Sequence, residues 1–237
     1  MAHARVSDSA RPETRMRANH PLRRRFARPG SASAPELRGA AGRMASTWAV
    51  LAAAPWLFSP MGFESATLIS FGLCTLLALM GRRARTLTPG RFGRKRSSAP
   101  LAALAGLGGG WALMPGLAQA VLQVGDVLGV PGPVPETGVR GPALLVATVL
   151  LAPVFEELIY REALLPALSV RFGHIMGIVL SSAAFALPHA TPWSMLGSFV
   201  AGLLLGATMS ASRSTPLCIG LHAGFNLRLA SLAWAPV

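Results

Sequence analysis

Long apolar runs alternate with short polar stretches along most of this chain. Each run is near the length that an α-helix needs to cross the roughly 30 Å hydrocarbon core of a bilayer. Backbone groups in lipid must be hydrogen-bonded internally, which favours helices over open strands. The runs lie at residues 46–60, 62–81, 99–122, 142–165, 173–190, 193–211 and 216–235. The pattern predicts an all-α, polytopic membrane helical bundle with about seven transmembrane helices, and six or eight are compatible with it.

Composition supports a membrane protein. The chain of 237 residues is 52% hydrophobic and 13% charged, with a mean hydropathy of +0.49. Soluble domains average about 45–50% apolar and about 25% charged residues. The two cysteines, Cys74 and Cys218, lie in different apolar runs without metal-ligand spacing. Neither a disulfide framework nor a cysteine metal site is therefore indicated.

The formal charge of +13 is concentrated in two stretches. Ten arginines lie in residues 1–45, and seven basic residues lie in 82–96. Basic residues between apolar runs are typical of the cytoplasmic side of a membrane protein. Two runs separate the stretches, so both stretches and the N-terminus are expected in the cytoplasm. The basic tail lacks interleaved aromatic residues and a recognition fold, so no nucleic-acid partner is expected.

The chain divides into three parts. Residues 1–45 are rich in Arg, Ser, Ala and Pro and are expected to be a basic, disordered tail. A targeting segment, or a translation start at Met44, fits the same composition. Residues 46–140 hold the N-terminal transmembrane helices and the basic loop. Residues 141–237 hold the groups that could carry chemistry, and we expect a catalytic helical bundle there.

Two adjacent glutamates interrupt the apolar run at 142–165. Charged groups at mid-membrane cost at least about 2.5 kcal/mol and usually mark a functional site. Glu157 and Arg161 are spaced i,i+4 in the favourable acid-first order, so they are expected to pair. Glu156 points about 100° away from Glu157 on a helix, which leaves an uncommitted carboxylate suited to act as a general base. The alternative is a structural Glu–Arg clamp between helices.

Two later runs supply further polar groups. Phe185 and His189 are spaced i,i+4, although a single histidine in an apolar helix is more often a packing residue. His222 and Asn226 have the same spacing and share one helix face. They form either an interhelical hydrogen-bonding stripe or a pair of donors for a reacting oxygen. Glu162, near the predicted membrane edge, is expected to be solvated.

Depth in the membrane gives a partial check. If Pro166 ends the helix that carries the glutamates, Glu156 lies roughly 15 Å from the cytoplasmic edge at about 1.5 Å per residue. His222 lies a similar distance from Arg213. His189 fits less well, because it falls near the far end of its run. A tilted or broken helix would bring it to the same level.

The three spacings together resemble the motifs of a known family, the CAAX prenyl protease and bacteriocin-processing (CPBP or Abi) intramembrane proteases. The Glu-Glu-x-x-x-Arg, Phe-x-x-x-His and His-x-x-x-Asn motifs match residues 156–161, 185–189 and 222–226. Each motif alone is weak, but all three occur in order on separate apolar runs. The resemblance covers about residues 141–228.

The resemblance implies an intramembrane endopeptidase that cleaves a membrane-associated or peptide substrate. It implies that Glu156 activates water with help from His189, and that His222 and Asn226 stabilise the oxyanion. Two other functions stay open: a catalytically silent membrane scaffold or bacteriocin-immunity protein with the same fold, and a proton-coupled transporter. Heavy use of Arg, Ala and Gly indicates a GC-rich bacterial genome, and hence the bacterial inner membrane.

Glu157 and Arg161 correspond in this resemblance to the supporting ion pair. No cofactor is required by these residues. Members of the family are often described as metalloproteases, so a divalent metal such as zinc is the alternative, and Glu156, His189 and His222 would then be its ligands. A metal-free reaction is the favoured interpretation.

Overall fold

The part of the chain that the structure describes is helical. The computed structural model describes four stretches, residues 34–86, 98–132, 141–189 and 191–233. No strand occurs in these stretches, so the all-α prediction is confirmed. The separate helices are α2 (Ala34–Leu57), α3 (Phe63–Thr86), α4 (Ala99–Leu128), α8 (His174–Ala186), α9 (Pro192–Ser212) and α10 (Thr215–Ala233), with a 3-10 turn at Ser59–Met61.

One continuous helical body between residues 142 and 172 carries the adjacent glutamates, and we call it the glutamate helix. Its hydrogen-bond register changes along its length. The successive segments are α5 (Pro142–Val146), the π-helical η4 (Ala147–Leu151), α6 (Ala152–Glu156), the π-helical η5 (Glu157–Leu164) and α7 (Leu165–Phe172). Gly173, with a φ of 87°, ends it in a conformation that favours glycine.

Each π-helical segment ends two residues before a proline. A proline inside a helix lacks an N–H, and its ring collides with the carbonyl four residues earlier. A wider turn relieves this conflict, and the amide of Ala152 accordingly donates to the carbonyl of Ala147, five residues back. The helix therefore continues through Pro153 and Pro166. The expectation that Pro166 ends the helix is wrong.

Four helices in the described stretches are long and apolar enough to cross a membrane. They comprise Phe63–Arg82, Ala99–Leu128, Pro142–Phe172 and Pro192–Ser212. Helix α8 is apolar but has only 13 residues. The prediction of a helical membrane bundle is confirmed, and each of the seven apolar runs coincides with a helix. The number of helices that cross the bilayer stays a prediction.

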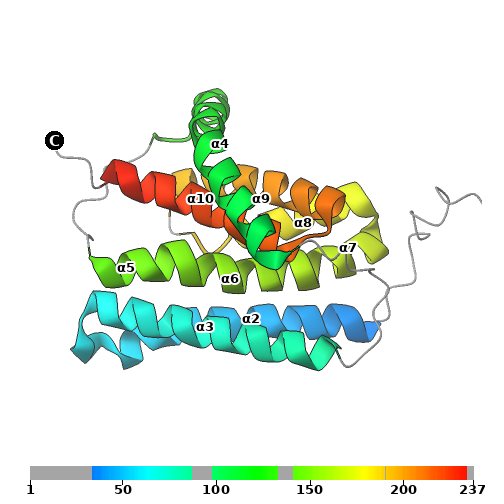
Figure 1. The fold of residues 1–237 in the computed structure, drawn as a ribbon, viewed down its shortest axis with the longest axis horizontal. Helices are drawn as coiled ribbons and strands as arrows, with labels where there is room; N and C mark the ends of the chain where they lie inside the picture. Colours follow the sequence, from blue (N-terminus) through cyan, green and yellow to red (C-terminus); the bar gives the residue numbers. More distant parts are fainter. Residues whose placement is uncertain (1–33, 87–97, 133–140, 190, 234–237) are drawn as a thin grey trace, which may run out of the picture.

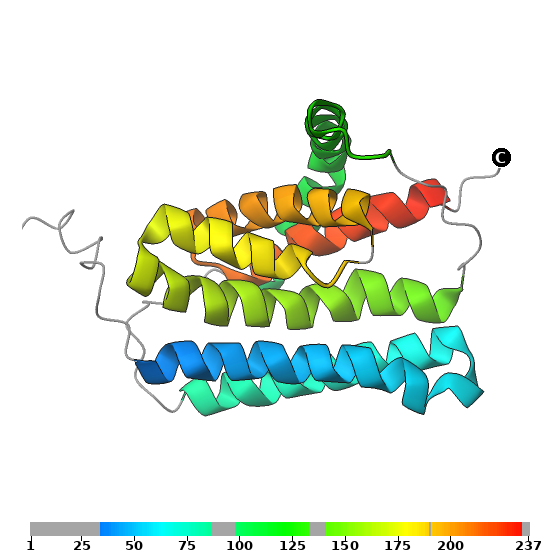
Figure 2. The same ribbon diagram turned by 180° about the vertical axis from the view of Figure 1, so that it is seen from behind.

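The helices are arranged in layers (Figures 1 and 2). Helices α2 and α3 lie side by side in one layer, and the glutamate helix lies between them and a layer of α8, α9 and α10. Helix α4 crosses α10, and its C-terminal part projects from the bundle. Because the glutamate helix is covered on two sides, its central residues are buried: Phe155, Leu158, Ile159 and Tyr160. The adjacent glutamates therefore lie at the centre of the bundle.

Helices α4 and α10 pack so closely that their backbones are in contact. Two pairs of glycines, each four residues apart, make this approach possible: Gly106, Gly110, Gly220 and Gly224. A Cβ on Gly110 would collide with the backbone carbonyl of Leu221. Small residues with this spacing are typical of closely packed membrane helices. Because Leu221 adjoins His222, the contact also positions the part of α10 that carries the imidazole.

Helix α2 begins inside the segment that the composition assigns to the tail. The helix starts at Ala34, whereas residues 1–45 were expected to be disordered. The first turns are rich in Ala, Leu, Glu, Arg and Met, which have high helix propensity, and Ala40 is buried in the core. The expectation is therefore wrong for residues 34–45, and residues 1–33 lie outside the described residues.

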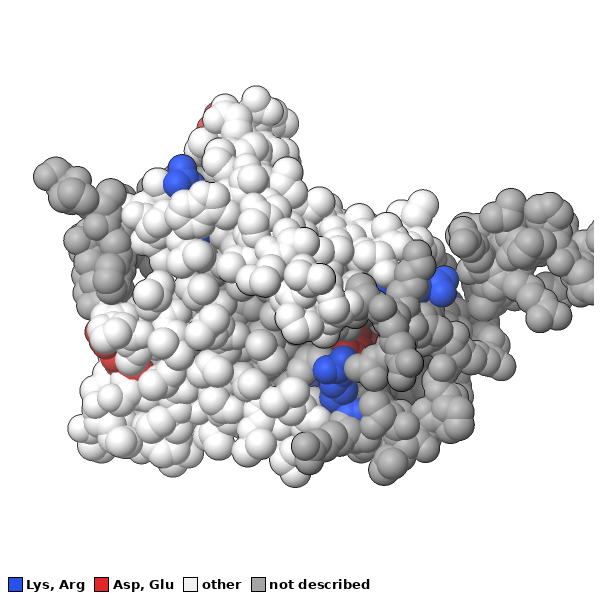
Figure 3. All heavy atoms as spheres, viewed as in Figure 1, with Lys and Arg blue, Asp and Glu red and all other residues white. Residues whose placement is uncertain are grey.

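The described residues present few charges on the face in Figure 3. On the face in Figure 3, the charged atoms gather near the ends of the helices, and the sides are uncharged. Several large apolar side chains of the described helices are more than half exposed, among them Leu76, Leu104 and Leu150. An apolar exterior of this kind suits contact with lipid chains, in agreement with a membrane location.

Candidate active site

Glu157 lies in a buried ion network. The side chains of Glu157 and Arg161 are fully buried, with Glu157 Oε2 3.3 Å from Arg161 Nε. Glu157 Oε1 lies 2.9 Å from His222 Nδ1. Arg161 Nη2 donates to the carbonyl of Gly202 at 3.4 Å, and the guanidinium carbon stands 4.4 Å from the centre of the Phe185 ring. The expected Glu157–Arg161 pair is formed, and the network links the glutamate helix to α8, α9 and α10.

His222 lies between the two glutamates. Its Nδ1 bonds to Glu157, and its Nε2 lies 3.6 Å from Glu156 Oε2. Because a carboxylate accepts hydrogen bonds, we assign the proton of the neutral ring to Nδ1. The 3.6 Å separation exceeds hydrogen-bond length, so Nε2 is not committed to Glu156. Glu157 thus holds the ring in an orientation that presents Nε2 to Glu156.

Glu156 has different surroundings from its neighbour. Its side chain is 17% exposed, whereas that of Glu157 is fully buried. Within the described stretches, the Glu156 carboxylate makes no hydrogen bond, and Nε2 of His222 lies 3.6 Å from it. The geometry agrees with the expectation of one committed and one uncommitted carboxylate, and the catalytic role of Glu156 stays a prediction.

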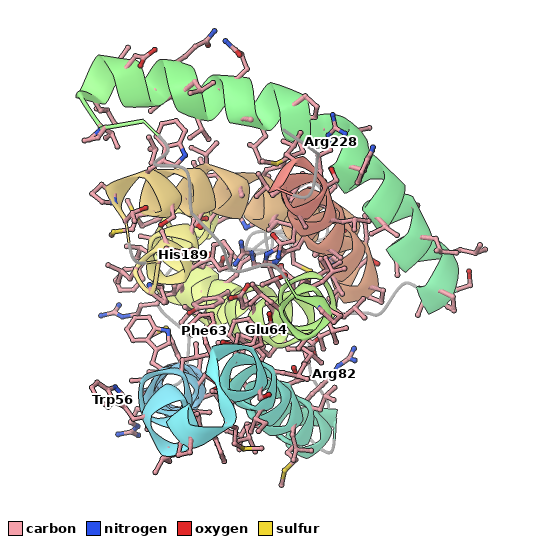
Figure 4. The ribbon with its side chains drawn as sticks, turned by 90° about the vertical axis from the view of Figure 1, so that its left-hand side faces the viewer. Trp56, Phe63, Glu64, Arg82, His189 and Arg228 are labelled. Carbon is pink, nitrogen blue, oxygen red and sulfur yellow. The ribbon has the colours of Figure 1, made fainter. Side chains whose placement is uncertain are left out.

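His189 lies beyond the end of α8. The helix ends at Ala186, and the backbone N–H of His189 donates to the Ala186 carbonyl at 3.0 Å in the turn that follows. The Phe185 ring still contacts both imidazoles, with centroids 5.5 Å from His189 and 5.5 Å from His222. Figure 4 shows His189 beside α8, on the side of the glutamate helix away from α2 and α3. The expected helix to residue 190 is wrong, because α8 ends at Ala186, and His189 shares its contact with Phe185 with His222.

Asn226 bonds to the backbone of the glutamate helix. Its Nδ2 donates to the carbonyl of Thr148 at 2.8 Å. This carbonyl lacks the usual helical donor, because Ala152 donates to the preceding carbonyl and Pro153 has no N–H. A primary amide carries two hydrogens on nitrogen, so the second N–H of Asn226 stays available to a reacting oxygen. The two interpretations of Asn226, hydrogen-bonding stripe and donor, are therefore compatible.

A second polar cluster escaped the sequence interpretation. Glu162 Oε1 lies 3.1 Å from Arg82 Nε, and Glu162 Oε2 accepts from the hydroxyl of Thr215 at 2.8 Å. The Glu162 side chain is 23% exposed, so the expectation that it is solvated is wrong. This cluster joins α3, η5 and α10. Glu162 and Arg82 are 80 residues apart, and spacing along the chain gives no signal for the pair.

No preformed metal centre is found among the described residues of the site. Among the residues that the structure describes, no three His, Cys, Asp or Glu side chains are grouped to hold an ion. Glu156, His189 and His222 were the alternative zinc ligands. The Nδ1 atom of His222 is engaged by Glu157, and the Nδ1 atom of His189 lies 3.2 Å from the carbonyl of Ala186, so Nε2 is the ring nitrogen that each histidine could offer to an ion. We derive no reaction step through a metal from this arrangement.

Comparison with known proteins identifies the segment that contains the site. A model of the Rce1-like type II CAAX prenyl endopeptidase family matches residues 139–228. No curated protein and no solved structure matches the chain. The matched segment contains all three motifs, whereas α2, α3 and α4 lie outside it. The resemblance inferred from the motifs is therefore confirmed, and residues 139–228 are similar to the Rce1-like type II CAAX prenyl endopeptidase family.

Proposed function

We propose that this chain is an intramembrane endopeptidase in which Glu156 activates a water molecule for attack on a peptide bond. The family match supports a protease as the general class. One observation carries the finer proposal. The two adjacent carboxylates differ, because Glu157 is held by Arg161 and His222, whereas Glu156 is uncommitted and faces Nε2 of His222.

In the proposed reaction, Glu156 takes a proton from water while the water oxygen attacks the carbonyl carbon of the substrate. A carbon–oxygen bond forms, and the carbonyl electron pair moves onto oxygen. Glu156 then delivers its proton to the leaving nitrogen as the carbon–nitrogen bond breaks. The products are a carboxylic acid and an amine, formed from one peptide bond and one water molecule without an acyl-enzyme.

His222 and Asn226 are the proposed donors to the oxyanion. To act as a donor, the His222 ring must carry a hydrogen on Nε2 as well as on Nδ1, and both ring nitrogens donate in that form. A single preorganised donor of this kind contributes on the order of 10²- to 10³-fold in kcat. We assign His189 an assisting role beside Glu156, supported by its contact with Phe185, which also contacts His222.

The proposed substrate is a membrane-associated protein or peptide. The apolar exterior keeps the protein in the bilayer, where a lipid-anchored chain end reaches the site by lateral diffusion. We propose that residues 141–237 form the catalytic bundle and residues 46–140 support it. The proposed location is the bacterial inner membrane, with the N-terminus in the cytoplasm.

The test uses the purified full chain in lipid vesicles. Two probes are offered: a fluorogenic farnesylated CAAX peptide and a library of unmodified peptides. We expect the wild-type protein to cleave a member of this set and Glu156→Ala to cleave none. Asp126→Asn, which changes an exposed acid of α4, is the matched control and should cleave normally. Cleavage by Glu156→Ala at the wild-type rate would refute the proposal.

A catalytically silent scaffold or immunity protein is the second candidate. The observation that favours it is that polar groups of the site already bond across helices, as Glu157 does with His222 and Asn226 with Thr148. A scaffold requires these contacts for its shape alone. Its cellular phenotype should therefore tolerate substitution of Glu156 or His189, which a protease should not.

A further inference from the structure

One hydrogen bond joins α2 to the glutamate helix beside the proposed site. Trp48 Nε1 donates to the hydroxyl oxygen of Tyr160 at 2.8 Å. Tyr160 is the single tyrosine of the chain and is 4% exposed. It directly precedes Arg161 in the first motif. Trp48 lies outside the segment 139–228 that the family model matches, so the comparison assigns it no role.

The Tyr160 ring begins a series of aromatic contacts that reaches both imidazoles. Its centroid lies 5.4 Å from that of Phe185, with the ring planes at 76°. The Phe185 ring contacts His189 and His222 at 5.5 Å each. These are edge-to-face contacts, which fix the relative orientation of aromatic rings. Phe185 is 3% exposed, and a closely packed buried ring moves only if its neighbours move.

The hydroxyl of Tyr160 adds an anchor that packing alone does not supply. A phenylalanine at this position would contact Phe185 equally well, but it would leave the indole N–H of Trp48 without its acceptor. The bond to Trp48 holds the hydroxyl end of the Tyr160 ring, and the edge-to-face contact with Phe185 holds the ring itself. An indole N–H that loses its acceptor away from water is unfavourable, so the two side chains are expected to stay together.

We propose that Trp48 and Tyr160 are a positioning pair for the reaction. The hydrogen bond between them holds the Tyr160 ring against Phe185, and Phe185 holds the imidazoles of His189 and His222 in place. Neither member of the pair touches the substrate. The inference rests on the proposed function and extends the working site to α2, beyond the matched segment.

The first test reads the histidine rings directly, without substrate. Full-length protein with ¹⁵N-labelled histidine is studied by NMR in detergent micelles, as wild type, Trp48→Phe, Tyr160→Phe and Trp56→Phe. Trp56 is on the same helix and is 84% exposed, which makes it the matched control. We expect the ring signals of His189 and His222 to shift in the first two variants and to match the wild type in the control. Wild-type signals in both Trp48→Phe and Tyr160→Phe would overturn the inference.

The second test measures turnover. Each single variant should lose roughly three- to tenfold in kcat, the equivalent of one hydrogen bond, with KM within about twofold of the wild type because the pair does not bind substrate. The kcat of the double variant should be no lower than that of the less active single variant, since both changes break the same contact. Losses that add in the double variant, or wild-type kcat in both singles, contradict the proposal. A wild-type protein without peptidase activity refutes the proposed function instead, while the NMR test still decides the positioning.

Discussion

At the residue scale, the adjacent glutamates differ because their partners differ. Glu157 has lost its contact with water and has Arg161 and His222 as partners, so its charge is balanced inside the bundle. Removal of one partner from a buried ion pair is costly, because the remaining charge stays buried without compensation. Glu156 keeps partial exposure and makes no hydrogen bond among the described residues, with Nε2 of His222 at 3.6 Å from its carboxylate. The network around Glu157 therefore supports the structure, and Glu156 is free for chemistry.

Arg161→Met tests the structural part of this division. The variant leaves the Glu157 carboxylate buried beside an apolar chain, and we expect a loss of about 3–5 kcal/mol in stability. Thermal unfolding in detergent should show a clearly lower midpoint and less accumulated protein. Arg171→Met, at the exposed end of the same helix, is the control and should change stability by less than about 0.5 kcal/mol. An unchanged midpoint for Arg161→Met would show that the network is dispensable.

At the element scale, the change of register in the glutamate helix decides which groups bond across helices. The π-helical segment η4 and Pro153 together leave the Thr148 carbonyl without its helical donor, and Asn226 supplies one. Asn226 therefore has a structural bond besides its proposed catalytic one. Substitutions of Asn226 and Pro153 together can separate the structural bond from the proposed catalytic one.

Asn226→Ala should cost about 1–3 kcal/mol in stability, because the Thr148 carbonyl loses its donor. Pro153→Ala restores a backbone N–H in the turn that follows Thr148, where it can donate to the Thr148 carbonyl, so the double variant should recover much of that stability. It should not recover cleavage, because the second N–H of Asn226 is still missing. Thermal unfolding and peptide cleavage of the two single variants and the double variant provide the measurement. Full activity in the stabilised double variant would limit Asn226 to a structural role.

The α4–α10 contact gives a prediction about another pair of elements. Gly110→Ala places a methyl group against the carbonyl of Leu221 and should force the helices apart, at a cost of about 1–3 kcal/mol for overpacking. Cleavage should fall as well, since His222 moves with α10. Gly108→Ala meets open space on the same helix and should leave both unfolding and cleavage unchanged. Equal behaviour of the two variants would contradict this account of the interface.

At the scale of the whole molecule, the sequence predicted where the helices lie better than how they bond. Apolar length is a local property, so all seven runs coincide with helices. The motifs also predicted that Glu157 pairs with Arg161, four residues away. By contrast, His222 bonds to Glu157 over a separation of 65 residues, and Trp48 bonds to Tyr160 over 112. Such partners depend on how helices pack, which spacing along one chain does not encode.

The effect of proline was also misjudged at this scale. Pro166 was expected to end a helix, but a π-helical turn accommodates it. Residues 34–45 were assigned to a tail because of their arginines, although their other residues favour a helix. A local sequence rule predicted the end of a helix in the first case and a disordered tail in the second. The π-helical turn accommodates Pro166, and helix propensity with burial of Ala40 favours a helix at residues 34–45.

Orientation in the membrane is testable with single cysteines. Both native cysteines are fully buried, so a new cysteine is the site that an impermeant thiol reagent reaches. The charge pattern predicts that a cysteine in 87–97 is labelled from the cytoplasmic side and one in 133–140 from the opposite side. Labelling of intact and permeabilised cells separates the two cases. Labelling of both positions from one side would contradict the predicted topology.

The central claim is that Glu156 activates the water that cleaves a membrane-associated substrate. Comparative membrane proteomics measures it most directly, with cells that produce either the wild-type protein or Glu156→Gln at equal levels. We predict that the variant accumulates at least one uncleaved precursor and that the matching cleaved chain end is absent. Identical sets of cleaved chain ends in the two strains would contradict the claim.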